Sequence, residues 1–476
     1  MKLAPYPEYK DSGAPWLGKI PAHWESRKLR NMLTPVSDRN RPDLPLLSVV
    51  REKGVIKRNV SSKEENHNFI PDDLSNYKVV LKGQFAMNKM KAWQGSYGVS
   101  NLDGIVSPAY FVFDLDGAEG KFFHVAIRSK TYVPFFTQAS DGVRVGQWDL
   151  NQSRMKEIPF FIPSAEEQTQ IACFLGWKTA QINKFIRNKR RLIELLKEQK
   201  QNVINQAVTR GLNPNVKFKP SGVEWIGDIP EHWEVRRIRA CIENYVAGIW
   251  GDEPDKNNTN EHIVCIRVAD FDMRNLSISQ NKLTIRAVPQ SAQKTRMLKA
   301  GDILMEKSGG GEAEPVGRVV YFDLDYPAVT SNFVTRLRPD SSVVKSRFLL
   351  FVLAILQATR RNVPSIKQTT GIQNLDERNY LSNYVGLPAL EEQDAIVEHI
   401  DAKSAEIDQA IIRAQREIEL MREYRTRLIS DVVTGQVDVR GIEVPEVAED
   451  ELLALDEDSS EADDVIDDEG DMDETD

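Results

Sequence analysis

The sequence predicts an α+β fold in which two mixed α/β domains are separated by two long antiparallel coiled-coil helices, with a pseudo-twofold internal repeat. Three observations in the 476-residue chain support this prediction. A short aromatic motif occurs twice, each copy precedes a segment of short predicted strands, and each segment precedes a long amphipathic stretch of helical periodicity. Because the three features recur in the same order, we interpret the chain as one plan used twice.

The aromatic motif is the strongest evidence for duplication. Residues 12–30 read SGAPWLGKIPAHWESRKLR and residues 221–239 read SGVEWIGDIPEHWEVRRIR, so 11 of 19 positions are identical. Each copy contains a His-Trp pair, His23–Trp24 and His232–Trp233, which could suggest catalysis. Neither copy has a nucleophile or a set of carboxylates nearby. We therefore expect the tryptophans to serve structural packing at the start of each half.

The segment from Pro163 to Gly211 predicts one long helix. Ser164 can cap its first turn, Glu167 can complete a capping box, and Gly211 is suited to end it. About 45 residues at 1.5 Å each would span roughly 68 Å. Its apolar residues follow coiled-coil spacing. They are Ile171, Leu175, Ile182, Ile186, Ile193, Leu196, Val203 and Ala207.

A second long helix is predicted 225 positions further along. The Pro-x-x-Glu-Glu-Gln start recurs at Pro388, and Gly435 is placed to end the helix. A narrow apolar stripe needs a partner helix, and each helix must return the chain to the start of a unit, so we expect an antiparallel pair. Two unrelated amphipathic helices are the alternative. The second stripe consists of Ile396, Ile400, Ile407, Ile411, Ile418, Met421, Leu428 and Val432.

Between motif and helix lie two divergent segments, about residues 31–162 and 240–387, which we expect to be mixed α/β. A faint common plan survives in them, because Gly83–Lys89 parallels Gly301–Lys307. Each segment also has one predicted helical stretch, Phe122–Phe136 and Ser346–Asn362, and a polar loop after it, 142–148 and 370–374.

Residue types that read base edges gather at corresponding places in the two segments. Arg and Lys can bind guanine through two hydrogen bonds, and Asn and Gln can bind adenine in the same way. Any one such cluster could instead be an ordinary solvated loop. The candidate DNA-binding residues are Lys89, Lys91, Gln94, Ser96, Tyr97, Arg144, Gln147, Lys307, Ser308, Lys367, Gln368, Thr369, Gln373 and Asn374.

Composition limits the class of protein. No apolar run approaches the ~18 residues of a membrane span, and the N-terminus has no signal-peptide pattern. Three scattered cysteines form no metal or disulfide spacing, which favours a reducing cytoplasm. We find no phosphate-binding loop, since Gly309–Gly311 lacks the following Lys-Ser/Thr and suggests only a flexible turn. Six histidines show no metal spacing, and we predict no catalytic site.

The net charge of −9 conceals two oppositely charged parts. Of the 71 acidic residues 18 lie between Glu443 and Asp476, whereas all 62 basic residues lie at or before Arg440. The preceding body therefore carries about nine net positive charges. A basic body with an acidic, disordered tail is typical of a nucleic-acid partner, although a solubilising tail on an ordinary protein is an alternative.

Two divergent domains within two matching frames of SG..W.G.IP.HWE and P..EEQ plus a long helix resemble the specificity (S) subunit of type I restriction–modification systems. The resemblance covers about residues 6–440. It implies that residues of about 31–162 and 240–387 are two target-recognition domains. The chain then divides into the first frame motif and domain (1–162), a central spacer helix (163–212), the second frame motif and domain (213–387) and a C-terminal spacer helix (388–440). The acidic tail (441–476) is not part of the pattern.

The resemblance also implies partners. Each target-recognition domain would bind one half of a bipartite site on double-stranded DNA, and the helices would set the gap. Two methyltransferase subunits, acting on adenine N6, would dock on the helices, and restriction subunits would join the complex. S-adenosylmethionine, ATP and Mg²⁺ would be used by these partners, with no cofactor on this chain. The expected partner-binding positions are Ile171, Leu175, Ile182, Ile186, Ile396, Ile400, Ile407 and Ile411.

Two other classes of protein are compatible with parts of the sequence. A coiled-coil scaffold that binds only proteins would explain the helices but not the paired polar loops or the basic body. A stand-alone nuclease would need a catalytic cluster that the sequence lacks. Steep salt dependence of DNA binding would separate the DNA reader from the scaffold.

Overall fold

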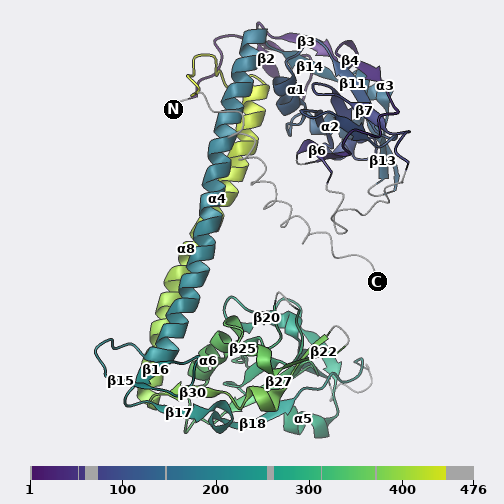
Figure 1. Cartoon of the computed structure of the whole chain (residues 1–476). Helices are drawn as coiled ribbons and strands as arrows, with labels where there is room; N and C mark the ends of the chain where they lie inside the picture. The colour runs from purple at the N-terminus through teal and green to yellow at the C-terminus, as the bar shows by residue number, and fades with distance from the viewer. Residues whose placement is uncertain are drawn as a thin grey trace. The chain divides into compact units, whose positions relative to one another are not determined.

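A computed structural model describes residues 3–51, 53–58, 73–144, 147–254, 262–311, 314–369 and 372–445. The expected acidic tail lies almost entirely outside these residues. The chain forms two compact units. Unit 1 takes Met1–Arg191 and Ala414–Asp476, and unit 2 takes Leu192–Arg413 (Figure 1). Both long helices contribute to both units, so each unit holds one divergent segment together with part of each helix.

The two units contain four-stranded antiparallel sheets of the same topology. In each sheet, the strand that follows the aromatic motif pairs with a later strand of the divergent segment, which pairs with a strand from the middle of the segment, and this middle strand pairs with the fourth strand. In unit 1 the order is β4 (Leu33–Val36), β11 (Phe111–Leu115), β8 (Phe85–Met87) and β9 (Tyr97–Val99). In unit 2 it is β18 (Ile242–Ala247), β27 (Val334–Pro339), β23 (Ile303–Glu306) and β25 (Val319–Tyr321).

Smaller paired strands close each unit. One strand of the aromatic motif pairs with the strand just before the long helix, so the ends of the divergent segment are held together. These pairs are β3 (Glu25–Lys28) with β14 (Pro159–Ile162) and β17 (Glu234–Arg237) with β30 (Tyr384–Leu387). The hairpins before them are β1 (Tyr9–Asp11) with β2 (Lys19–Pro21) and β15 (Phe218–Pro220) with β16 (Asp228–Pro230).

The remaining strands differ in extent between the units. Unit 1 has two antiparallel pairs joined by a parallel bridge between Leu46 and Ile105, whereas unit 2 has a three-stranded sheet with one parallel pairing. The unit 1 pairs are β5 (Leu47–Val50) with β6 (Gly54–Lys57) and β7 (Lys78–Val80) with β10 (Gly104–Val106). The unit 2 elements are β22 (Thr284–Ala287), β19 (His262–Ile266) and β26 (Ala328–Thr330), with β20 (Phe271–Asp272) and β21 (Ser277–Ile278) alongside.

The short helices differ in detail from the prediction. The single stretch expected over Phe122–Phe136 is two helices, α1 (Gly120–Ile127) and α2 (Val133–Gln138). Proline in the first turn of α2 suits a new helix start and not a continuation, because it donates no N–H. In unit 2, α6 (Ser346–Ala358) ends before the predicted Asn362. Further short helices are α3 (Gln152–Lys156), α5 (Gln290–Arg296) and α7 (Glu377–Tyr380).

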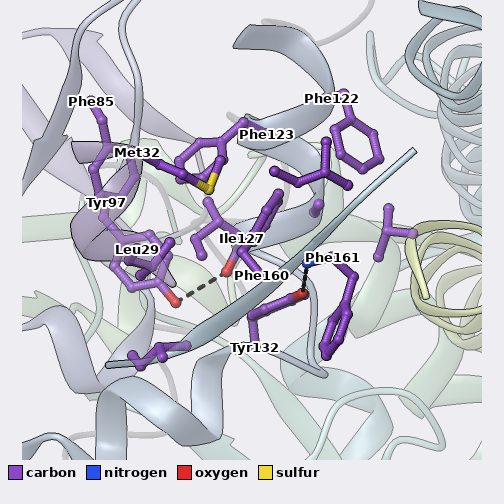
Figure 2. Close-up of a cluster of buried hydrophobic side chains, with 14 of the residues drawn as sticks. Leu29, Met32, Phe85, Tyr97, Phe122, Phe123, Ile127, Tyr132, Phe160 and Phe161 are labelled. Carbon is purple, nitrogen blue, oxygen red and sulfur yellow. Dashed lines mark hydrogen bonds between the residues drawn. The ribbon is translucent and has the colours of Figure 1, made fainter. Parts of the chain in front are cut away.

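The core of unit 1 is rich in aromatic side chains, and the hydroxyl groups of two of its tyrosines, Tyr97 and Tyr132, are hydrogen-bonded (Figure 2). The buried Tyr97 hydroxyl donates to the Ile127 carbonyl at 3.3 Å, and the Tyr132 hydroxyl accepts the Phe161 N–H at 3.3 Å. Burial raises the pKa of Tyr132 well above its ordinary value. Bonding these hydroxyls removes most of the cost of placing them among apolar rings.

The long helices α4 (Ala165–Arg210) and α8 (Leu390–Val433) pack against each other within each unit (Figure 1). In unit 1, Arg425 donates to the Asn183 side chain at 2.8 Å. In unit 2, Lys200 and Asp408 form an ion pair at 2.8 Å. Residue numbers rise along one helix as they fall along the other, so the pair is antiparallel as predicted. Gly211 and Gly435 follow the two helix ends with positive φ, which also agrees with the prediction.

The apolar stripe is used inside the chain. All eight positions expected to contact partner subunits are buried in unit 1 or unit 2, so they are not available as docking contacts in this structure. They are Ile171, Leu175, Ile182, Ile186, Ile396, Ile400, Ile407 and Ile411. Among the described residues, no helix has the length and apolar character needed to cross a membrane.

The Glu-Glu-Gln start of each long helix has a structural role that corrects one expectation. The Ser164 hydroxyl accepts the Glu167 N–H at 3.4 Å, as a cap would. The Glu167 carboxylate does not return to the helix start. It accepts hydrogen bonds from the Tyr6 hydroxyl at 2.6 Å and the Trp24 indole at 3.0 Å, and it lies 2.7 Å from His23 Nε2. The carboxylate thus joins the helix to the aromatic motif.

The second unit repeats this junction. Glu392 accepts the Trp233 indole N–H at 3.1 Å and lies 2.9 Å from His232 Nε2. The glutamine that follows each glutamate also has one role in both copies. Gln168 accepts the Glu119 N–H and Gln393 accepts the Lys345 N–H, both at 2.7 Å, at the residues that precede α1 and α6. These contacts agree with the interpretation of the tryptophans as packing residues.

Candidate nucleic-acid interface

In both units, the lysine that follows the middle strand is joined by its main chain to a hairpin. The Lys89 carbonyl accepts the Leu150 N–H at 3.3 Å, and the Lys307 carbonyl accepts the Leu375 N–H at 2.8 Å. The segments predicted as polar loops are in fact these hairpins. They are β12 (Ser140–Arg144) with β13 (Gln147–Leu150) and β28 (Ile366–Thr369) with β29 (Ile372–Leu375). The predicted correspondence of Lys89 with Lys307 therefore has a structural basis.

Unit 2 brings several predicted residues together on one small sheet. The strand β24 (Ser308–Gly309) pairs with β29, which pairs with β28. The Ser308 hydroxyl donates to Asn374 Oδ1 at 2.6 Å, and Asn374 lies opposite Lys367 in the strand register. The exposed Lys367 ammonium lies 2.7 Å from the Asp376 carboxylate, which lowers the pKa of Asp376. The segment Gly309–Gly311 was expected to be a flexible turn, but its first residue, Gly309, belongs to the strand β24.

Gln373 does not fit the predicted role of direct base contact. Its side chain is buried, and its Oε1 accepts the Val316 N–H at 3.2 Å. Side chains alternate along a strand, so the hairpin is anchored by Gln373 while its neighbours Ile372 and Asn374 face the other way. The side chains of Gln368 and Thr369 lie outside the described part of the chain.

A buried ion pair fixes the end of the strand that delivers Lys307. The fully buried Glu306 carboxylate receives two hydrogen bonds from Arg318, at 2.9 and 3.0 Å. The hydrogen bonds to Glu306 raise the pKa of the Arg318 guanidinium. A bidentate ion pair of this kind fixes the position of the strand end, and its two charges cancel. The outward-facing positive charge at this site therefore comes from the lysines.

In unit 1 the contact between the Lys89 segment and the β12–β13 hairpin is built around two tryptophans that were not predicted from the sequence. The 3₁₀ turn η2 (Ala92–Gln94) places the Trp93 ring against Trp148 of β13, with centroids 5.3 Å apart and planes at 26°. Gly142 lies against the Trp148 indole, because a Cβ there would stand 2.6 Å from a ring carbon. The Lys89 ammonium is 2.7 Å from Asp149. A tryptophan directly opposite a glycine in a hairpin, as Trp148 is opposite Gly142, is the signal that could have found this stack.

The other predicted residues of unit 1 divide into exposed and buried groups. Lys91 is exposed and Gln94 is half-buried in the same turn. Ser96 and Tyr97 are buried in the core, so neither fits a direct DNA contact. Arg144 and Gln147 face each other in the register of the β12–β13 hairpin, but their side chains lie outside the described part of the chain.

The described residues contain no cluster of three or more His, Cys, Asp or Glu side chains suited to a metal ion. His124 is half-buried in unit 1, where burial and the nearby Arg128 guanidinium lower its pKa to about 3. The low pKa keeps its side chain neutral at ordinary pH. The two units therefore present equivalent lysine–hairpin contacts that carry different polar side chains.

Comparison with known proteins identifies what the chain is similar to. Residues 230–419 match the family model described as the type I restriction modification DNA specificity domain. The MjaX specificity subunit of Methanocaldococcus jannaschii is 21% identical over 454 residues, covering 89% of this chain and 96% of that protein. The MjaVIII specificity subunit of the same organism is 23% identical over 299 residues, covering 62% and 65%.

A solved structure shares the fold. It comes from work on complex assembly and conformational transition of a type I R-M system, with a TM-score of 0.63, 16% identity, and coverage of 88% of this chain and 99% of that one. The chain is therefore similar in sequence to type I restriction–modification specificity subunits, and its fold is that of the solved structure.

Proposed function

We propose that this chain is the DNA-recognition subunit of a type I restriction–modification complex, with each unit reading one half of a bipartite site. The proposal rests on one observation: the two units have equivalent lysine–hairpin contacts, and these contacts carry different side chains. Unit 1 offers Lys89 and Lys91 beside a tryptophan stack, whereas unit 2 offers Lys307, Lys367 and Asn374 on a small sheet. Related frames that carry different donors and acceptors suit two different base sequences.

Electrostatics supports DNA as the ligand. The body before the acidic tail carries about nine net positive charges. The exposed lysines beside the two hairpins, Lys91 and Lys367, can neutralise phosphates. Binding should therefore weaken steeply as salt rises. A scaffold without DNA specificity, the other class weighed from the sequence, is not supported by the comparisons.

The long helices are proposed to set the gap and to carry the methyltransferase subunits. Readers on one face of the duplex would place half-site centres about one turn, roughly 34–36 Å, apart. Because the inner stripe is filled by the chain itself, docking would use outward apolar residues. Those exposed on the helix parts of unit 2 are Leu192, Leu195 and Ile412, and those of unit 1 are Leu420 and Tyr424.

The chemistry of the complex would lie with the partners. Two methyltransferase subunits would transfer a methyl group from S-adenosylmethionine to adenine N6, and restriction subunits would use ATP and Mg²⁺. This chain would bind no cofactor and would direct both activities by holding DNA.

The test is the methylome of a host without its own modification systems, expressing this chain with the methyltransferase encoded beside it. One split motif, methylated on both strands and dependent on this chain, is the expected result. A stable complex that methylates no motif would contradict the proposal and favour a protein scaffold. The methyltransferase expressed without this chain is the control.

A further inference from the structure

An exposed phenylalanine lies beside Lys307 and was not among the predicted site residues. Phe333 belongs to the turn between β26 and β27, and its carbonyl accepts the Lys307 N–H at 2.9 Å. The register of β23 with β27 ends at the pair Glu306 and Val334, both fully buried, so Lys307 and Phe333 form the next pair. Side chains alternate across a strand, and this pair therefore lies on the opposite face.

The phenylalanine is presented by a rigid turn. Its side chain is 48% exposed, an unusual place for a large aromatic group. The chain on either side is held by hydrogen bonds from the Gly248 N–H to Val334 and from the Ile249 N–H to Thr330, at 3.0 and 2.8 Å. Gly248 lies so close that a Cβ there would stand 2.1 Å from a carbonyl oxygen of the turn. The structure thus fixes the backbone and leaves the ring open to solvent.

Unit 1 provides an internal comparison. Its register pairs Met87 with Phe111, as unit 2 pairs Met305 with Thr335. Two steps back from Phe111, as Phe333 is two steps back from Thr335, stands the exposed Ala109, in a turn outside the β8–β11 pairing. Unit 1 therefore has a methyl group at the position where unit 2 has an aromatic ring.

We propose that Phe333 is a specificity-determining residue that contacts the 5-methyl group of a thymine, next to the base that Lys307 reads, in the half-site bound by unit 2. This inference rests on the proposed DNA-recognition function. Thymine is the base that presents a methyl group in the major groove, and apolar side chains such as phenylalanine read it by contact. Ala109 is too short to make the equivalent contact from unit 1.

The test uses the full-length chain in complex with its methyltransferase, and duplexes of the methylated motif in which each thymine is replaced in turn by deoxyuridine. That change keeps base pairing and removes one methyl group. We expect one thymine, in one half-site, whose replacement weakens binding about fourfold. Phe333→Ala should bind the two duplexes equally, while Phe333→Leu should keep most of the preference. Ile285→Ala, a matched loss of an apolar side chain that is 52% exposed on β22, should behave as wild type.

The outcomes separate this inference from the function beneath it. A wild-type complex without sequence-specific DNA binding would overturn both. Specific binding in which no thymine responds to deoxyuridine, or in which Phe333→Ala retains the preference, would overturn this inference alone. Loss of methyltransferase from the Phe333→Ala complex would also overturn it, because the ring would then be a protein contact.

Discussion

The two glutamates that join each long helix to its aromatic motif differ in burial, so the same substitution should have different effects at the two positions. Glu167→Ala and Glu392→Ala remove equivalent carboxylates, but their surroundings differ. The Glu167 side chain is 3% exposed and the Glu392 side chain is 31% exposed. Glu167 accepts hydrogen bonds from Tyr6 and Trp24, both buried, whereas Glu392 accepts one from a buried donor, Trp233.

The magnitudes follow from the donors left without an acceptor. Each buried, unpaired donor costs about 1–3 kcal/mol. Glu167→Ala strands two such donors and should destabilise its junction by about 2–6 kcal/mol, while Glu392→Ala strands one and should cost about 1–3 kcal/mol. The histidines add little to this difference, because His23 and His232 are largely exposed and can turn to water.

Amide hydrogen exchange measured by mass spectrometry reports each junction separately. Peptides covering residues 19–30 should exchange at least about 30-fold faster in Glu167→Ala, taking 1.4 kcal/mol as tenfold, with residues 228–239 unchanged. Glu392→Ala should show the reverse location and a smaller effect. Equal effects of the two variants, or less than a threefold change at residues 19–30, would refute the assignment of these carboxylates as the junction.

Three further predictions concern the site, the core and the helices. Lys307→Ala should cost about 1–3 kcal/mol of specific binding and relax one base position of one half-site, measured by competition among single-base variants of the motif. The pKa of His124 is lowered to about 3, so below pH ~6.5 the unfolded chain binds a proton that the folded chain does not. As the pH is lowered from ~6.5 to ~3, the free energy of unfolding should therefore fall by about 1.4 kcal/mol per pH unit. Denaturant titrations of His124→Gln should lack this pH-dependent component. Ile412→Ser, at a side chain 55% exposed, should weaken methyltransferase binding in calorimetry without changing the free energy of unfolding, whereas Ile407→Ser, at a buried position, should lower stability. Unchanged affinity in Ile412→Ser would remove that face from the proposed docking surface.

The features that could be predicted from sequence are those fixed by long repeats. The duplicated motif, the paired helices and the equivalence of Lys89 with Lys307 needed only register counting, because coiled-coil spacing and strand order repeat over many residues. The helix ends at Gly211 and Gly435 followed from glycine, which adopts positive φ without the steric cost that a Cβ brings.

The errors arose where tertiary contacts decide which way a side chain faces. Tyr97 and Gln373 have polar groups suited to bases, but strand alternation turns one into an aromatic core and the other onto the Val316 amide. The acceptor role of Glu167 and the stack of Trp93 on Trp148 join residues far apart in sequence. The stripe was correctly placed, yet its burial within the chain removed it as a partner surface.

The central claim is that each unit reads its own half-site, and a segment exchange tests it most directly. Residues 240–387 would be replaced by the corresponding segment of another family member of known target, keeping the aromatic motif, both helices and unit 1 unchanged. The methylome of the exchanged chain, expressed with the same methyltransferase, should retain one half of the original motif and acquire one half of the donor's. Change in both halves, or in neither, would contradict the claim that the two units read DNA independently.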